Sequence, residues 1–229
     1  FLFVSHESPH FPFQGPDDEK KVIDETNWME ADAKTYVAML EDLDSEVGRL
    51  LKALEESNLV KNTLVIFVSD NGGFAKAAHM GPLRGAKSST LEGGIRVPLI
   101  VRWPGVVGAG TTSNEPVSSV DYFPSIADAV GCDIPSDHEI DGKSLLPLLK
   151  SAGRYSLNRD SIYWHFPHYR HSPGPYSIIR SGDWKLIKWY EGGFELYNLK
   201  NDISEKINMA AAMASKVKEL DRQLTAELS

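Results

Sequence analysis

Two oxygen donors follow a short apolar run in the middle of the chain. The run 64–68 is succeeded, after one serine, by Asp70 and Asn71 and then by two glycines. A carboxylate and an amide oxygen at the carboxyl end of a buried strand stand where open α/β sheets bind ligands. Calcium and magnesium prefer oxygen donors of this kind. The segment therefore predicts a metal-binding position, with a glycine-rich turn capped by Asp-Asn as the alternative.

A candidate cation for an anionic substrate lies sixteen residues further on, at Lys87. The stretch 70–96 around it holds six glycines and little periodicity, and long irregular loops are often functional. An ammonium beside a metal suits an oxyanion; the alternative is a solvated loop lysine. His79 and Arg84 are candidate substrate contacts in the same stretch. Arg96 is a candidate either for substrate or for holding the loop by hydrogen bonds.

The first two thirds of the chain have the pattern of an α/β domain. Apolar residues at three- and four-residue steps predict a helix over 27–56 that stops at Asn58. Three apolar runs predict strands of one larger parallel sheet, namely 1–5, 64–68 and 97–101. Two shorter helices are predicted, one capped by Asp121 and stopped by Gly131, and one capped by Ser144 that runs through Leu149.

The character of the sequence changes after about residue 152. Strands of a small antiparallel sheet are predicted at 161–166, 176–180, 185–190 and 194–198, with Ser181-Gly182-Asp183 as a hairpin signal. A closing helix near 209–228 is expected to bury Val217, Leu220, Leu224 and Leu228. We therefore predict an α/β domain over 1–152 and a small α+β subdomain over 153–229.

Composition excludes some classes of function. The 229 residues carry a net charge of −8 and no basic block, which argues against nucleic acid as a partner. The only cysteine, Cys132, leaves no intrachain disulfide. No segment approaches the apolar length of a membrane span. Because Phe1 already opens an apolar run without an initiator methionine, we expect a longer chain upstream, which would carry any targeting signal.

Six segments resemble, in order and spacing, those of the sulfatase family. They are 5–13 (SHESPHFPF), 68–72 (VSDNG), 87–98 (Lys87 followed by EGGIRVP), 141–149 (DGKSLLPLL), 180–187 (RSGDWKLI) and 195–199 (ELYNL). The resemblance runs nearly the full length. It implies the C-terminal part of an alkaline-phosphatase-like α/β fold: a mixed or parallel sheet with flanking helices, plus a small C-terminal antiparallel sheet packed with a helix.

The resemblance also implies roles for individual residues. Asp70 and Asn71 correspond to the second pair of calcium ligands, and Asp70 also to a group that helps activate the nucleophile. Lys87 corresponds to the sulfate-binding lysine. His10 corresponds to a histidine that contacts the sulfate, and an imidazole can also protonate the leaving oxygen. The alternative for His10 is a structural residue of an extended, proline-rich loop. The implied activity is hydrolysis of aryl or carbohydrate sulfate esters.

One departure from the family pattern concerns the nucleophile. Sulfatases use a formylglycine made from the cysteine of a Cys-x-Pro/Ala-x-Arg motif, whereas Cys132 is followed by DIPS and has no such arginine. We interpret Cys132 as an ordinary residue near a helix end. The formylglycine and the remaining calcium ligands are expected upstream of Phe1. The chain alone is therefore expected to be inactive.

Other interpretations stay open at this point. His165, His168 and His171 interleave with aromatic residues, which fits a metal cluster, a loop at the substrate mouth or aromatic packing; we take His165 as a candidate substrate contact. A phosphodiesterase or phosphonate hydrolase of the same superfamily is one alternative function, and a non-catalytic binding module is another. Sheet strands left uncovered would allow self-association. The family resemblance suggests a periplasmic, secreted or lysosomal protein.

Overall fold

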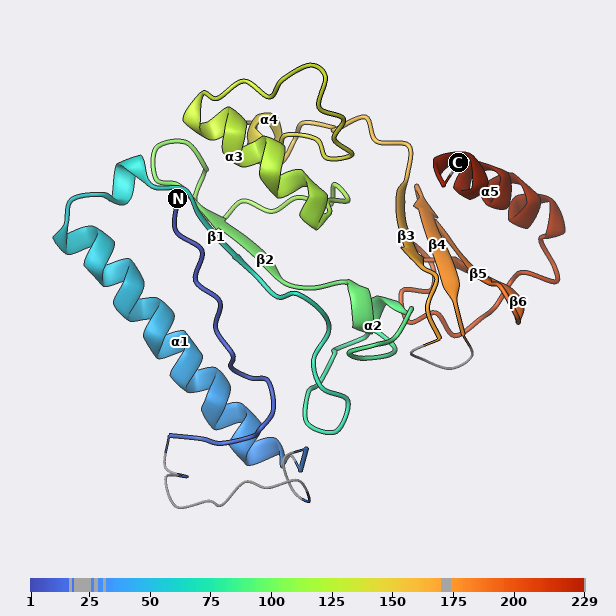
Figure 1. The fold of residues 1–229 in the computed structure, drawn as a ribbon, viewed down its shortest axis with the longest axis horizontal. Helices are drawn as coiled ribbons and strands as arrows, with labels where there is room; N and C mark the ends of the chain where they lie inside the picture. The colour runs from blue at the N-terminus through green and yellow to red at the C-terminus, as the bar shows by residue number, and fades with distance from the viewer. Residues whose placement is uncertain (17, 19–25, 27–28, 31, 170–173, 229) are drawn as a thin grey trace. The chain divides into compact units, whose positions relative to one another are not determined.

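The computed structural model divides the chain into two compact units, coloured along the chain in Figure 1. It describes all residues except 17, 19–25, 27–28, 31, 170–173 and 229. The N-terminal unit comprises Phe1–Thr63 and Ser69–Pro98, and the C-terminal unit comprises Leu64–Val68 and Leu99–Ser229. Among the described residues, none of the helices combines the length and apolar character that a membrane crossing requires.

The long helix of the N-terminal unit is α1 (Ala33–Glu56). Asp32 caps its first turn through its side chain. At the other end, Asn58 takes a left-handed φ of 57°, and the N–H of Leu59 donates to the carbonyl of Leu54 at 2.9 Å. This is a Schellman closure, in which a left-handed residue ends the helix. The predicted stop at Asn58 is confirmed. The helix begins later than predicted, and part of the predicted start lies outside the described residues.

An aromatic core lies beside this helix. Phe13, Tyr36 and Met39 are buried together, with Phe11 and Phe74 packed against them. The apolar run over residues 1–5 does not join this core. Residues 1–5 lie outside any strand, and the first three side chains are exposed. The predicted strand over 1–5 is therefore wrong for this chain, because an apolar run becomes a strand only where a neighbouring strand accepts its backbone hydrogen bonds.

A two-stranded sheet opens the C-terminal unit. It consists of β1 (Val65–Val68) and β2 (Leu99–Arg102), which pair antiparallel with Phe67 opposite Ile100. Both strands were predicted, but their predicted parallel arrangement is wrong. Parallel neighbours need a long crossover, usually a helix. The only helix in the described connection 69–98 is the single turn α2 (Glu92–Ile95).

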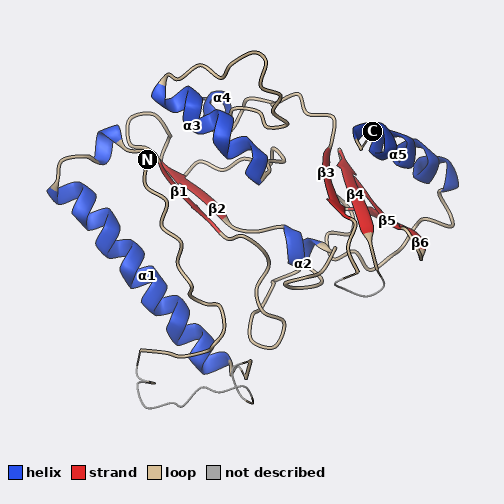
Figure 2. Cartoon of the chain, in the orientation of Figure 1, coloured by secondary structure: helices blue, strands red, loops and turns tan. Residues whose placement is uncertain are grey.

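The second sheet is a four-stranded antiparallel meander, as predicted (Figures 1 and 2). Its strands are β3 (Ile162–Phe166), β4 (Tyr176–Ser181), β5 (Trp184–Trp189) and β6 (Gly193–Asn198). Gly182, with φ 55°, occupies the tight turn between β4 and β5.

The closing helix α5 (Ala214–Glu227) covers one face of this sheet. The core between them contains Ile179, Leu186, Leu196, Val217, Leu220 and Leu224. Leu228, which was also expected to be buried, is 36% exposed because it follows the last helical residue.

Short helices precede the four-stranded sheet: α3 (Tyr122–Val130), which ends at left-handed Gly131 as predicted, and α4 (Leu146–Lys150). Asp121 does not cap α3 with its side chain, contrary to prediction. Its fully buried carboxylate instead accepts the N–H groups of Ser118 (2.8 Å) and Lys143 (2.9 Å) and pairs with Arg159.

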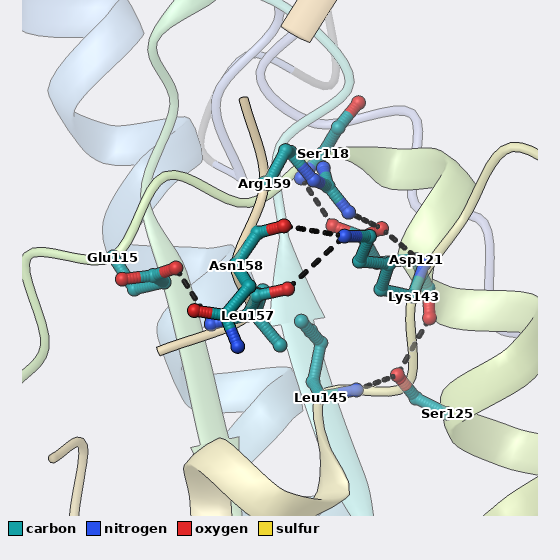
Figure 3. Close-up of polar contacts among 9 residues, drawn as sticks. All are labelled: Glu115, Ser118, Asp121, Ser125, Lys143, Leu145, Leu157, Asn158 and Arg159. Atoms are coloured by element: carbon teal, nitrogen blue, oxygen red, sulfur yellow. Dashed lines mark hydrogen bonds and ion pairs between the residues drawn. The ribbon is translucent and has the colours of Figure 1, made fainter. Parts of the chain in front are cut away.

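Figure 3 shows the same network extended by the Lys143 ammonium. Its Nζ donates to the carbonyls of Leu157 (3.1 Å) and Asn158 (2.7 Å). Leu145 occupies the cap position of α4, without a side-chain cap, so the predicted cap at Ser144 is wrong by one residue. The Ser144 hydroxyl nevertheless accepts the N–H of Leu146 at 3.2 Å. Three separate loops are thus tied together around the buried carboxylate of Asp121.

Candidate functional site

The Asp70-Asn71 pair sits on a turn that only glycine can build. Gly72 is buried, and its N–H donates to the carbonyl of Gly94 at 3.0 Å. A Cβ on Gly72 would lie 1.9 Å from the carbonyl oxygen of Gly93, which is far inside van der Waals contact. The two glycine pairs therefore touch backbone to backbone, and this contact fixes where Asp70 and Asn71 emerge.

Lys87 is tied to the same turn. Its N–H donates to the carbonyl of Gly73 at 2.9 Å. The N–H of Gly93 donates to the carbonyl of Arg84 at 2.7 Å, which closes the loop that carries Lys87. The carboxylate-amide pair and the lysine are thus connected through main-chain hydrogen bonds despite their separation in sequence.

His10 and Lys87 share one aromatic neighbour. The His10 ring lies 4.0 Å from the Phe11 ring, centroid to centroid, and Lys87 Nζ lies 5.8 Å from the centroid of Phe11. Phe11 also meets the ring of Phe74, which directly follows the Asp-Asn-Gly-Gly turn, at 6.3 Å. The structure therefore brings the histidine loop, the lysine loop and the oxygen-donor turn together around Phe11.

Asp70 and Asn71 fit a share of a metal site. The Asn71 amide nitrogen donates to Asp70 Oδ2 at 2.5 Å. This contact engages one carboxylate oxygen, so the remaining oxygen donors of the pair are the second carboxylate oxygen and the amide oxygen. Calcium takes six to eight oxygen ligands. No group of three or more His, Cys, Asp or Glu side chains in the described part of the chain could hold a metal ion. The pair thus suits a calcium ion only alongside further ligands.

The side chain of Tyr36 packs against the turn at Gly73. A Cβ at Gly73 would lie 3.2 Å from the Tyr36 hydroxyl oxygen, so helix α1 packs closely under the turn. Burial raises the pKa of the Tyr36 phenol above its ordinary value, and a hydrogen bond with the backbone of Phe74 lowers it by less. The phenol is therefore neutral over the physiological range and acts as a packing and hydrogen-bonding group.

The other candidate residues of this loop make contacts within the loop itself. His79 is exposed, and its Nδ1 accepts the N–H of Gly81 at 3.2 Å. Arg84 is exposed and contributes its carbonyl to the loop. Arg96 lies 3.8 Å from the buried carboxylate of Glu92, one turn away in α2. For Arg96 this contact favours the role of holding the loop.

His165 lies in the other unit, on β3. Its Nδ1 is 2.8 Å from the hydroxyl of Ser177, which is 2.9 Å from the hydroxyl of Tyr190. Sequence reasoning missed both partners, although the alternation of the two strands places His165 directly opposite Ser177. His168 packs against Phe166, with ring centroids 5.1 Å apart. His171 lies outside the described residues.

Family models match this chain over its whole length. The model described as Sulfatase matches residues 1–132, and the model described as N-sulphoglucosamine sulphohydrolase, C-terminal, matches residues 86–229.

Named relatives agree with these models. A sulfatase of Formosa agariphila is 39% identical over 77% of this chain and 35% of its own length. An N-acetylglucosamine-6-O-sulfatase of Bacteroides thetaiotaomicron is 34% identical over 82% of this chain and 34% of its own length. The steryl-sulfatase of Rattus norvegicus is 42% identical over 57% of this chain and 24% of its own length. The chain thus spans about a third or less of these relatives.

Solved structures show the same fold. The structure of Ps i-CgsB superposes with a TM-score of 0.80 at 33% identity, covering 96% of this chain and 48% of that one. A structure in complex with its substrate D-glucosamine-2-N,6-O-disulfate superposes with a TM-score of 0.70 at 31% identity, covering 85% and 40%. The fold is the alkaline-phosphatase-like fold of these enzymes. The family models, the named relatives and the solved structures together show that this chain belongs to the sulfatase family.

Proposed function

We propose that this chain supplies the substrate-facing part of an enzyme that hydrolyses sulfate esters of carbohydrates. The observation that carries the proposal is the convergence of His10 and Lys87 on Phe11, beside the turn that bears Asp70 and Asn71. A tetrahedral dianion needs positive charge and hydrogen-bond donors around its oxygens. One of the named relatives, an N-acetylglucosamine-6-O-sulfatase, supports a carbohydrate substrate.

Lys87 is the group we assign to a sulfate oxygen. It is half-buried, and the face of the Phe11 ring lies under its ammonium, which restricts the flexible side chain without removing its charge. Its backbone N–H is fixed on Gly73. The ammonium is therefore held in place before a substrate arrives, which favours binding of the developing charge.

His10 is the group we assign to the departing oxygen. Its Nδ1 lies 2.8 Å from the carbonyl oxygen of Phe11, so Nδ1 carries a hydrogen and donates a hydrogen bond to the backbone. The ring is exposed, and its Nε2 is free to face the substrate. A protonated imidazole in this orientation can give its Nε2 proton to the leaving alkoxide.

Asp70 and Asn71 would hold a calcium ion jointly with ligands from outside this chain. When bound, the ion supplies positive charge to the sulfate oxygens and to the nucleophile. The formylglycine nucleophile is expected upstream, because the sequence after Cys132 lacks the family motif. We therefore expect the 229-residue chain to be inactive by itself.

The experiment compares two proteins: the 229-residue chain and the longer product of the same coding sequence. Both are assayed with a chromogenic aryl sulfate, 6-sulfated N-acetylglucosamine and a phosphonate monoester, with calcium and with a chelator. The longer protein should hydrolyse the sulfates, and Lys87→Ala should lower kcat/KM by about 100-fold or more. Lys76→Ala, an exposed lysine of the same loop, should leave it unchanged.

Three results would contradict the proposal. They are hydrolysis by the 229-residue chain, equal activity of wild type and Lys87→Ala, or preference for the phosphonate. The last would favour the function of a phosphonate monoester hydrolase of Agrobacterium radiobacter, whose structure superposes with a TM-score of 0.66 at 27% identity.

A further inference from the structure

A methionine contacts the main chain of the turn that bears Asp70 and Asn71. The N–H of Gly73 donates to the Sδ of Met80 at 3.3 Å. A thioether sulfur is a weak acceptor, and methionine more often fills irregular gaps between apolar side chains. Here the sulfur instead meets a partly buried backbone N–H, a group that needs a hydrogen-bond partner. Met80 therefore makes a polar contact with the oxygen-donor turn.

Consecutive main-chain groups of this turn have different partners. The N–H of Gly72 donates to the carbonyl of Gly94 at 3.0 Å. The N–H of Gly73 donates to Met80, and the carbonyl of Gly73 accepts the N–H of Lys87 at 2.9 Å. Of these three bonds, only the one to Met80 involves a side chain, so it is the one that a substitution can remove. Gly73 thus links the oxygen donors to the lysine loop.

Three side chains enclose the backbone at Gly73. A Cβ at this position would lie 2.4 Å from the Cβ of Ala78, 3.2 Å from the hydroxyl oxygen of Tyr36 and 3.4 Å from the Sδ of Met80. Because glycine has no Cβ, these neighbours pack directly on the main chain. The Met80 sulfur therefore combines a packing contact with a hydrogen bond.

The backbone of Met80 is itself held in place. The N–H of Leu83 donates to the carbonyl of Met80 at 3.2 Å, and Gly81 between them has a φ of 60°, which favours glycine in a tight turn. The N–H of Gly81 donates to the Nδ1 of His79 at 3.2 Å. The sulfur is therefore presented to Gly73 by an ordered segment of the loop.

Removal of the sulfur would affect both sides of Gly73. A backbone N–H that loses its acceptor costs stability and turns towards another partner or towards water. Rotation of the peptide group between Gly72 and Gly73 would displace Asn71, which directly precedes it. The same rotation would alter the carbonyl on which the N–H of Lys87 is fixed.

We propose that Met80 is a positioning residue for the oxygen donors Asp70 and Asn71 and for Lys87, acting through the N–H of Gly73. The inference rests on the proposed function and adds a residue to its site. Every contact that it uses lies within the N-terminal unit. Met80 needs to touch neither the calcium ion nor the sulfate.

The test uses the longer, active protein and the variant Met80→Leu, which keeps an apolar side chain of similar size and lacks the acceptor. In isothermal titration, its calcium affinity should fall about fivefold. At saturating calcium, KM for a sulfate ester should rise about threefold, with kcat within about twofold of wild type. Hydrogen exchange of the Gly73 amide should be about tenfold faster.

Two further variants separate hydrogen bonding from packing. Met80→Gln has an unbranched side chain whose amide oxygen can accept the same N–H, so all three measurements should return to within about twofold of wild type. Met213→Leu removes a similarly half-buried thioether that packs against the core of the four-stranded sheet. This control should leave the three measurements unchanged.

The outcomes distinguish this inference from the function beneath it. Wild-type values of Gly73 exchange and calcium affinity in Met80→Leu would overturn the positioning role. Equal losses in Met80→Leu and Met80→Gln would also overturn it, since they would assign Met80 a packing role. If wild type neither binds calcium nor hydrolyses sulfates, the proposed function fails, and the exchange of the Gly73 amide still decides whether Met80 fixes the turn.

Discussion

The ammonium of Lys185 and the carboxylate of Glu205 lie 2.9 Å apart, and neither side chain is exposed to solvent. Lys185 belongs to β5, and Glu205 belongs to the connection between β6 and α5. Removing two charges from water is costly, so such a contact is tolerable only when both partners are present. The pair therefore holds the connection between β6 and α5 against the sheet.

We predict that Lys185→Met destabilises the chain by about 3–5 kcal/mol, because the Glu205 carboxylate is left buried without its counter-ion. Urea denaturation followed by circular dichroism measures the loss. A Lys185→Met/Glu205→Leu double variant should recover most of it, since apolar groups can replace a buried pair. The exposed pair of Lys52 and Glu56 is the control, and Lys52→Met should cost less than about 1 kcal/mol. Equal losses for the two lysines would contradict the argument.

A second prediction concerns the contact between glycine pairs. Gly72→Ala places a methyl group 1.9 Å from the carbonyl oxygen of Gly93, so the turn must shift. Because that turn carries Asp70 and Asn71, we expect calcium affinity of the longer protein to fall at least tenfold, with the midpoint of thermal unfolding lowered. Isothermal titration with calcium measures the first effect.

The matched control is Gly48→Ala, inside α1. A Cβ there meets no atom within 4 Å, and its φ is not positive. Since alanine favours a helix interior, this substitution should stabilise the protein by about 0.5–1 kcal/mol. Unchanged calcium affinity in Gly72→Ala would show that the glycine contact does not position the donors.

Local chemistry made parts of the fold predictable. The hairpin at Gly182 and the stop at Asn58 depend on single residues that tolerate a left-handed backbone, and both are confirmed. The strand over 1–5 and the parallel arrangement of 64–68 and 97–101 were predicted wrongly, because both depend on partner strands that one sequence does not specify. Aspartate is a residue type that often caps helices, yet the carboxylate of Asp121 contacts Lys143 and Arg159, which are distant in sequence.

The residues of the candidate site also differ in how far the sequence could predict them. Residue type and spacing were enough to select Asp70, Asn71 and Lys87 as candidates, and the glycines that connect them could be recognised as a loop of special conformation. Phe11, on which His10 and Lys87 meet, could not be singled out, because an aromatic residue in a proline-rich loop has no signature of its own. The contact between Ser177 and His165 was missed for a similar reason, since it arises only from the strand register.

The Tyr36 phenol leads to a prediction about alkaline pH. Burial holds its pKa above the ordinary value of 10.0, so the unfolded chain releases this proton first. The contribution of the neutral Tyr36 phenol to folding stability is therefore fully present below pH 10. It is lost as the pH rises through the folded-state pKa. Tyr36→Phe should lessen the drop in unfolding midpoint between pH 9 and 11, whereas Tyr155→Phe, at an exposed tyrosine, should not. Identical pH profiles for wild type and Tyr36→Phe would refute this.

The last prediction concerns self-association. Phe67 and Ile100 form a cross-strand pair in the two-stranded sheet, yet they are 38% and 61% exposed. A two-stranded sheet with uncovered apolar side chains tends to associate. We expect the 229-residue chain to form concentration-dependent oligomers in sedimentation velocity, and Ile100→Lys to shift them towards monomer because a charge opposes strand-to-strand contact. Ile207→Lys, at a similarly exposed isoleucine outside any strand, should leave the distribution unchanged. A monomer at all concentrations, or an equal effect of both substitutions, would exclude this sheet as the contact surface.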